Sequence, residues 1–143
     1  MSIFAKLAAG VTTTSADETR ALAAGLGAEL PADTTLALHG DLGVGKTTFT
    51  QGLAQAFGIH EAVTSPSFTI FNLHRGTRTL IHLDAYRLEN GGQIDALMLE
   101  DFLTPPYCLV VEWPEKIAEW MPANALHLTL SIEGEGRHRI RLG

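Results

Sequence analysis

Hydrophobic residues recur at nearly helical spacing near the start of the chain. Three leucines follow Ser15, a residue type that caps helix N-termini, so a helix is predicted over about residues 16–30, ending at Pro31. Residues 34–39 form a run that predicts a buried strand. A second helix is predicted over about residues 46–57, and the glycine that follows closes it.

The second half of the chain is richer in strand-forming residues. Residues 68–73 and 79–83 have the composition of strands, and residues 75–78 between them are typical of a hairpin turn, which predicts an antiparallel pair. The other predicted elements are a helix over 93–103, a buried strand over 107–111 and two terminal strands over 125–132 and 137–142. Residues 8–14 and 133–136 are expected to be mobile.

Composition and charge limit the kinds of function. The chain has 143 residues, 45% of them hydrophobic, as expected of one compact domain over residues 1–143. Its 10 Lys and Arg residues face 16 Asp and Glu residues, and the net charge of −6 argues against a broad nucleic-acid-binding face. Contact with RNA is therefore expected to go through another protein.

The chain carries no recognisable targeting segment. Residues 1–14 lack the apolar run of about 7–15 residues of a signal peptide, and no segment reaches the ~18 apolar residues of a membrane span. A cytoplasmic protein without a membrane partner is expected. The single cysteine, Cys108, lies in an apolar run, which predicts a buried and reduced thiol.

Residues 40–47 match the phosphate-binding pattern G-x-x-x-x-G-K-[ST] and stand between a predicted strand and a predicted helix, as the motif requires. Its glycines let the backbone turn N–H groups inward around a phosphate, and the next helix adds its positive N-terminal dipole. Lys46 is expected to reach the β- and γ-phosphates, and the Thr47 hydroxyl to be a Mg²⁺ ligand. The predicted ATP-binding residues of this loop are Asp41, Leu42, Gly43, Val44, Gly45, Lys46, Thr47 and Thr48.

A nucleotide-bound Mg²⁺ also needs a carboxylate, which in an open α/β sheet belongs at the carboxyl end of a parallel strand. Two acidic residues stand in that position, Asp84 after residues 80–83 and Glu112 after residues 108–111. Both are candidate metal ligands and, with Lys46, candidate catalytic residues. The elements together predict an α/β fold of the P-loop NTPase type, with a mixed, mostly parallel sheet flanked by helices.

Three more blocks accompany the phosphate-binding loop. The four blocks are residues 40–49 (GDLGVGKTTF), 63–69 (VTSPSFT), 82–88 (HLDAYRL) and 111–115 (VEWPE). In these blocks and their order the chain resembles the TsaE (YjeE) family, small bacterial P-loop ATPases required for threonylcarbamoyladenosine synthesis on tRNA. The resemblance covers nearly the whole chain, and kinases and GTPases do not share the last three blocks.

The resemblance implies roles for particular residues. Thr47 and Glu112 would hold Mg²⁺, and Asp84 would be needed for ATP turnover. The implied switch loop over the γ-phosphate consists of Ser65, Pro66, Ser67, Phe68 and Thr69. In this loop a serine, Ser67, replaces a threonine of the family and keeps its hydroxyl. Arg137 lies in a segment similar to one near the nucleotide in the family.

For four other motif residues the sequence allows both a structural and a functional interpretation. They are His82, Tyr86, Arg87 and Trp113. A histidine in an apolar strand is usually a core residue, and a Trp-Pro pair is often a packed corner. Arg87 could pair with nearby Asp84, or contact a phosphate or a partner.

The resemblance implies a Mg²⁺-dependent ATPase that acts as an accessory subunit in threonylcarbamoyladenosine modification of tRNA. Its partners would be a TsaD-like transferase and a TsaB-like subunit, whose repeated turnover it would drive, and it would reach tRNA only indirectly. Neither a water-positioning glutamine nor an arginine finger is assignable in the sequence, so hydrolysis by the chain alone is expected to be slow.

Three other functions are compatible with a phosphate-binding loop. A small-molecule kinase would need an acceptor site and usually an arginine-rich lid, and neither is visible in the sequence. A GTPase would carry Asn-Lys-x-Asp after a strand, which this chain lacks. A nucleotide-gated interaction module with incidental hydrolysis stays open.

Overall fold

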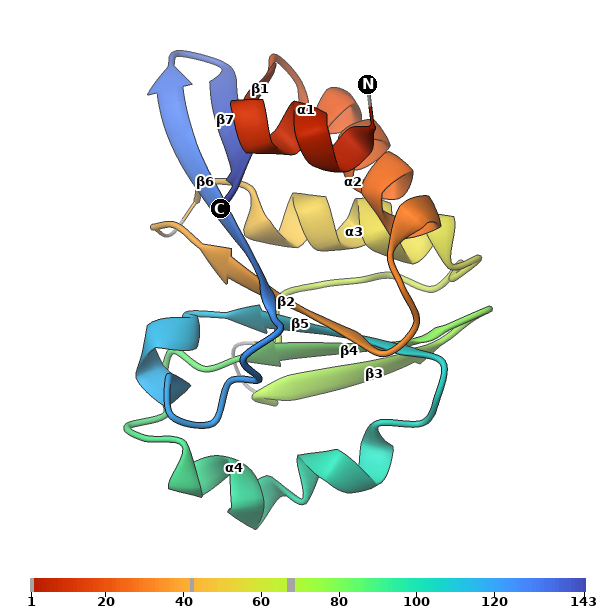
Figure 1. Cartoon of the computed structure of the whole chain (residues 1–143), viewed down its shortest axis with the longest axis vertical. Coiled ribbons are helices and arrows are strands. Elements are labelled where there is room, and N and C mark those ends of the chain that lie inside the picture. Colours follow the sequence, from red (N-terminus) through yellow and green to blue (C-terminus); the bar gives the residue numbers. More distant parts are fainter. Residues whose placement is uncertain (1, 42, 67–68) are drawn as a thin grey trace.

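The computed structural model describes residues 2–41, 43–66 and 69–143, which form one mixed sheet with helices on both faces (Figure 1). In chain order the elements are α1 (Ile3–Ala9), β1 (Val11–Thr13), α2 (Ala16–Glu29), β2 (Thr34–His39), α3 (Lys46–Ala56), β3 (Phe71–Arg75), β4 (Thr79–Asp84), α4 (Gly92–Leu97), the 3₁₀ turn η1 (Leu99–Phe102), β5 (Tyr107–Glu112), the 3₁₀ turn η2 (Pro114–Ile117), β6 (Leu126–Gly134) and β7 (Arg137–Leu142).

The strand order in the sheet is β1-β7-β6-β2-β5-β4-β3. Its centre is parallel, because β2 pairs in parallel with both β5 and β6, and β4 pairs in parallel with β5. The two flanks are antiparallel, with β3 on β4 at one side and β7 joining β6 to β1 at the other. The predicted α/β class with a mixed sheet is confirmed, and so is the antiparallel β3–β4 pair.

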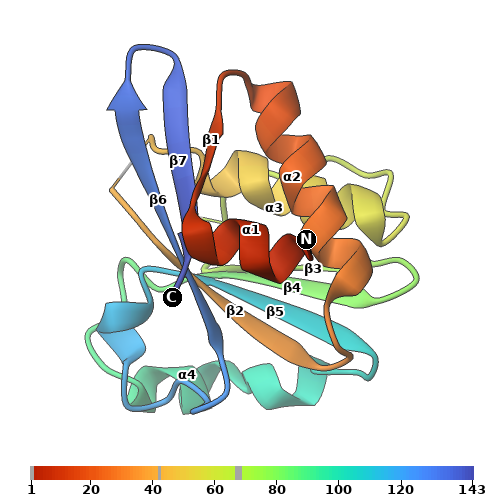
Figure 2. The same ribbon diagram turned by 45° about the horizontal axis from the view of Figure 1, so that its top comes forward.

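Each face of the sheet has its own hydrophobic core. Helices α1, α2 and α3 lie on one side, and α4 with η1 lies on the other, below β3, β4 and β5 (Figures 1 and 2). Leu36 and Leu38 of β2 point into the first core, where they meet Phe49 and Leu53 of α3. The second core gathers apolar residues of β4, β5, α4 and η1. The central strands are therefore buried on both faces, as their unbroken apolar runs predict.

The predicted helices α2 and α3 form and pack on each other. Ser15 caps α2 as predicted, because its side chain accepts a hydrogen bond from the Glu18 backbone N–H at 3.1 Å. Gly52 of α3 permits the close approach, since a Cβ atom there would lie 2.3 Å from the Arg20 carbonyl oxygen and 2.6 Å from the Ala23 Cβ. This contact fixes α3, whose N-terminus carries the phosphate-binding motif.

The expectation that residues 8–14 are mobile is wrong. Ala8 and Ala9 end α1, and Val11–Thr13 form β1, an edge strand in which Val11 pairs with Ile140 of β7. A helix of seven residues and a strand of three are too short for a periodic pattern, and β1 depends on a partner far away in the sequence. The expectation for residues 133–136 is wrong at its start, because Glu133 and Gly134 belong to β6.

Two other predicted boundaries change in the structure. The helix predicted over 93–103 breaks at Met98, whose φ of 54° is left-handed, into α4 and the 3₁₀ turn η1. The strand predicted from residue 68 begins at Phe71, because Ile70 has a φ of 72° that a strand cannot contain. Ile70 instead accepts the Asp84 backbone N–H at 2.7 Å, which ties this turn to the end of β4.

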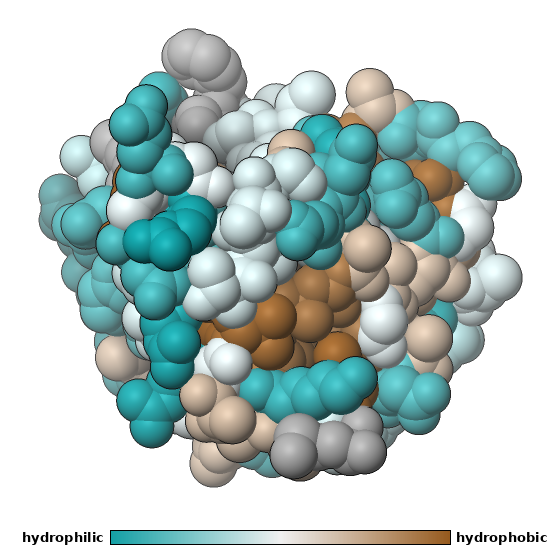
Figure 3. Space-filling model, turned by 90° about the horizontal axis from the view of Figure 1, so that it is seen from above, coloured by the Kyte–Doolittle hydropathy of each residue, from teal (hydrophilic) through white to brown (hydrophobic). Residues whose placement is uncertain are grey.

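Seen from above, the surface near α1, α2 and the β6–β7 hairpin has hydrophobic side chains in a central hollow and hydrophilic ones around it (Figure 3). Among the described residues, no helix is long and apolar enough to cross a membrane.

Candidate functional site

The predicted phosphate-binding loop connects the end of β2 to the start of α3. Gly40, Gly43 and Gly45 have φ angles of 148°, 80° and 100°, values that side-chain-bearing residues rarely adopt. Gly40 has a second constraint, because a Cβ atom there would lie 2.5 Å from the Leu130 carbonyl oxygen. Of the other predicted loop residues, Asp41 is exposed and Leu42 lies outside the described residues. Gly45 is the N-cap of α3, so the chain turns directly into the helix N-terminus.

Lys46 is buried at the first position of α3, with 5% of its surface exposed. Its Nζ atom donates a hydrogen bond to the Gly40 carbonyl at 2.6 Å and lies 4.0 Å from the ring centroid of Trp113. Burial lowers the pKa of Lys46, and the carboxylates of Glu112 and Asp84 oppose that shift. The ammonium group therefore stands between the loop and the two acidic residues.

A cavity of about 380 Å³ opens beside this lysine. Its described lining residues are Gly43, Gly45, Lys46, Thr47, Thr48, Ser65, Asp84, Glu112 and Trp113. All of them were predicted as site residues from the sequence, and they come from four segments that are far apart along the chain. The fold therefore brings all four motif blocks to one cavity.

Asp84 and Glu112 are the last residues of β4 and β5 and stand opposite each other in the parallel register. The Asp84 carboxylate accepts the Tyr86 backbone N–H at 3.0 Å, and the Ala85 backbone N–H donates to the Glu112 carbonyl at 3.0 Å. Both side chains are nearly buried, with residue exposures of 9% and 5%. The carboxyl ends of two parallel strands thus present two carboxylates to the cavity, as the sequence predicts.

His82 is fully buried in β4 and is hydrogen-bonded through Nε2 to the Glu112 carboxylate. Its other ring nitrogen, Nδ1, has no partner among the described residues. His82 is therefore a core residue, as the structural interpretation holds, and it also contacts a candidate metal ligand, Glu112, whose carboxylate it can orient.

The donor set around the cavity fits Mg²⁺. Thr47 supplies a hydroxyl, and Asp84 and Glu112 supply carboxylates, which are the oxygen ligands that Mg²⁺ prefers. No cluster of three or more His, Cys, Asp or Glu residues suited to a metal occurs in the described residues. Such an ion would therefore need further oxygens, as nucleotide phosphates provide.

The predicted switch loop approaches the cavity at Ser65, which lines it. Pro66 is buried, and its carbonyl accepts the Ile70 N–H at 2.8 Å, while the Thr69 hydroxyl donates to the Asn72 side chain at 2.8 Å. The predicted residues Ser67 and Phe68 lie outside the described residues. The two described ends of this loop are thus held close to β3, next to the cavity.

The remaining predicted residues that the structure describes are not among those that line the cavity. Tyr86 is 50% exposed, and its ring centroid lies 5.1 Å from that of Trp113. Arg87 follows it on an exposed turn. Arg137 is exposed at the start of β7 and is absent from the described lining residues.

Sequence reasoning missed two histidine contacts near the loop. His138 donates from Nδ1 to the carbonyl of Val44, a buried loop residue, at 3.1 Å. His39, just before the loop, stacks on His127, with 2.8 Å between His39 Nε2 and His127 Nδ1. Burial and the neighbouring His127 lower the pKa of His39. The His39–His127 pair joins β2 to β6, and the His138–Val44 bond joins β7 to the loop. No local sequence motif indicates either contact.

Fold and site together define an α/β protein with a phosphate-binding loop motif between β2 and α3 and two carboxylates at neighbouring strand ends. The chain belongs to the TsaE family, because the model described as "Threonylcarbamoyl adenosine biosynthesis protein TsaE" matches residues 13–140. The resemblance inferred from the four blocks is confirmed.

Similar proteins agree with this membership. A tRNA threonylcarbamoyladenosine biosynthesis protein TsaE of Bacillus subtilis is 36% identical over 129 residues, which are 90% of this chain and 80% of that protein. A Treponema pallidum protein of the same name is 32% identical over 88% of this chain and 93% of its own length. The crystal structure of Bacillus subtilis YdiB superposes with a TM-score of 0.77 and 32% identity, covering 92% of this chain and 81% of that chain.

Proposed function

We propose that this protein binds ATP with Mg²⁺, hydrolyses the ATP, and serves as an accessory subunit in threonylcarbamoyladenosine modification of tRNA. The observation that carries the proposal is the common cavity of Lys46, Thr47, Asp84 and Glu112. A glycine-rich loop at a helix N-terminus, one ammonium, and two carboxylates beside a hydroxyl are the groups that phosphoryl-transfer sites use. Family membership supplies the modification pathway.

Each side chain has a distinct task in this proposal. The Lys46 ammonium would leave the Gly40 carbonyl to contact phosphate oxygens in the cavity that Lys46 lines. Thr47 and Glu112 hold Mg²⁺, which when bound neutralises phosphate charge. Asp84 is needed for turnover, and the Tyr86 N–H fixes its carboxylate toward the cavity. His82 keeps Glu112 oriented.

The proposed partners are a TsaD-like transferase and a TsaB-like subunit, in the cytoplasm, with tRNA reached only through them. Hydrolysis by the chain alone is expected to be slow, because its motifs contain no assignable arginine finger or water-positioning glutamine. Arginine fingers accelerate related enzymes by roughly 10³–10⁵. The partners would then control turnover through the loop of residues 65–69, whose Ser65 reaches the cavity.

Binding measurements test the nucleotide part of the proposal directly. Calorimetry of the purified protein should detect ATP binding that strengthens with Mg²⁺. A separate product assay distinguishes the kinase alternative, which predicts phosphate transfer to an added acceptor instead of phosphate release. Absence of ATP binding in the presence of Mg²⁺ would contradict the proposal. A pull-down with the TsaB–TsaD pair in ATP, in ADP and without nucleotide tests the partner part separately.

A further inference from the structure

Strand β7 carries an unusual concentration of positive charge for an acidic chain. Arg137, Arg139 and Arg141 account for three of its 10 Lys and Arg residues. Because side chains alternate along a strand, these arginines share one face of β7, and the residues between them share the other. Ile140, on that other face, is fully buried in the first core.

The arginine-bearing face of β7 and β6 is not covered. Helices α1, α2 and α3 lie on the opposite side of these strands, and α4 lies below β3, β4 and β5 (Figures 1 and 2). On β6, Thr129 and Ser131 are exposed, whereas Leu128 and Leu130 between and beside them are buried. Within the described residues, this half of the sheet therefore presents a bare polar face to solvent.

The four polar residues of this face line one hollow of about 390 Å³, together with Gly143. The register pairs Thr129 with Arg141 and Ser131 with Arg139, so each guanidinium stands beside a hydroxyl. Arg139 also donates to the Ala9 carbonyl at 3.2 Å, whereas Arg141 has no hydrogen bond or ion pair with any described residue. The hollow thus combines a fixed cation, an uncommitted cation and two hydroxyls.

We propose that this arginine face, made of Thr129, Ser131, Arg139 and Arg141, docks an acidic segment of a protein partner. Guanidinium groups bind carboxylates with two parallel hydrogen bonds, and neighbouring hydroxyls can donate to the same oxygens. This docking rests on the proposed function, in which the chain works with other proteins.

Carboxylates around the hollow favour a protein over a nucleic acid as the occupant. Glu133 lies beside it on β6, where it accepts the Thr12 hydroxyl at 2.6 Å. Asp41 lines an adjoining hollow of about 550 Å³ that shares Thr129 and Ser131 with the first. A continuous polyanion such as RNA would be repelled by both carboxylates and by the net charge of −6. A protein segment can instead place single carboxylates against the arginines, away from Glu133 and Asp41.

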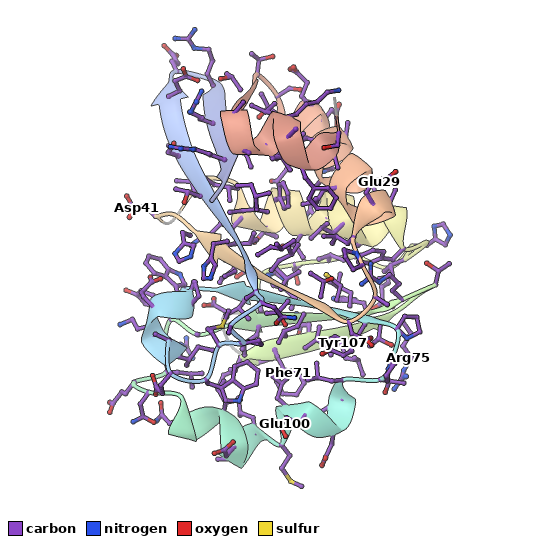
Figure 4. All side chains as sticks on the ribbon, in the orientation of Figure 1. Glu29, Asp41, Phe71, Arg75, Glu100 and Tyr107 are labelled. Carbon is purple, nitrogen blue, oxygen red and sulfur yellow. The ribbon has the colours of Figure 1, made fainter. Side chains whose placement is uncertain are left out.

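The same strand reaches the nucleotide site. His138, between two of the arginines, donates to the Val44 carbonyl in the phosphate-binding loop at 3.1 Å. Figure 4 shows Asp41 of this loop projecting on the side of the molecule where β6 and β7 lie. A partner bound to the arginine face would therefore sit next to the loop that holds the phosphates.

A charge-reversal experiment tests the arginine face. The affinity for the TsaB–TsaD pair is measured by calorimetry in ATP for the wild type, Arg141→Glu and the matched control Arg75→Glu. Arg75 is an exposed arginine of β3, the strand at the opposite edge of the sheet (Figure 4). Arg141→Glu should weaken binding by about tenfold or more and reduce its salt dependence, while Arg75→Glu stays within about twofold.

The possible outcomes separate the docking face from the proposed function. Equal affinity of wild type and Arg141→Glu would overturn the docking face and leave the partnership intact. Failure of the wild type to bind the pair would overturn both. The last measurement is a titration of each variant with transfer RNA alone. If Arg141→Glu abolished RNA binding and left partner binding unchanged, the face would be a nucleic-acid site and the proposal would be overturned. Equal thermal melting of the variants confirms that all are folded.

Discussion

The buried imidazole of His82 in β4 is hydrogen-bonded to the carboxylate of Glu112 in β5, across two neighbouring parallel strands. His82 has no exposed surface, and Glu112 has 5%. A buried carboxylate without a hydrogen-bond donor is unfavourable, and His82 supplies that donor. The pair thus links the core of the sheet to the cavity.

The His82–Glu112 pair should contribute measurably to the stability of the fold. His82→Leu should lower the free energy of unfolding by about 1–3 kcal/mol, because it leaves a buried carboxylate without its donor. The double variant His82→Leu, Glu112→Leu should recover part of that loss, since neither polar partner is left alone. Urea unfolding is measured for His82→Leu, Glu112→Leu and the double variant, and simple additivity of the two single losses would contradict the coupling.

The phosphate-binding loop gives the second prediction. Lys46→Ala should weaken ATP binding by about tenfold to a hundredfold with or without Mg²⁺, because it removes the ammonium that faces the cavity. Thr47→Ala removes only the proposed metal ligand, so the loss of ATP affinity should appear chiefly in the presence of Mg²⁺. Calorimetry in both conditions decides, and equal losses for Thr47→Ala would refute the metal assignment.

The packing of α2 on α3 yields a matched pair of glycine variants. Gly52→Ala should destabilise the fold by about 1–3 kcal/mol, because the new methyl group would meet the Arg20 carbonyl of α2. Gly25→Ala in α2 is the control, since the nearest atom to its Cβ is 3.9 Å away, and helix propensity should stabilise it by about 0.5–1 kcal/mol. Thermal unfolding of the two variants should shift in opposite directions. Equal shifts would contradict the described packing.

Cys108 provides a test of the core without mutation. It is fully buried, and burial raises the pKa of its thiol to about 12. The thiolate is the reactive form, so at pH 8 the native protein should not react with a thiol reagent, whereas the unfolded protein should react completely. Ellman's reagent with and without guanidinium measures this. Rapid labelling of the native protein would mean that β5 is not buried as described.

The motif blocks could be located from the sequence because each contains its own local signal. The loop of residues 40–47 has its glycines, and Asp84 and Glu112 end apolar runs that can only be buried strands. Parallel strand ends meet at one edge of a sheet, so their convergence also followed. Elements with strong periodicity, such as α2, were predicted within about a residue.

What the sequence could not predict depends on contacts between distant segments. Strand β1 exists because Val11 pairs with Ile140 of β7, a partner 129 positions along the chain from it. The His82–Glu112 bond and the placement of Lys46 over the Trp113 ring likewise join separate strands or loops. The break at Met98 arises from a single left-handed residue within an otherwise helical composition.

The central claim is that Lys46, Thr47, Asp84 and Glu112 form a Mg²⁺-dependent ATPase site that works with partners. Phosphate release from ATP, measured with and without the TsaB–TsaD pair, tests it most directly when wild type is compared with Asp84→Asn and Glu112→Gln. These amides keep the shape of the side chain and one acceptor oxygen but lose the charge. We predict slow release by wild type, marked stimulation by the pair, and loss of both in each folded variant. Unchanged release in either variant, or no response to the pair, would contradict the account.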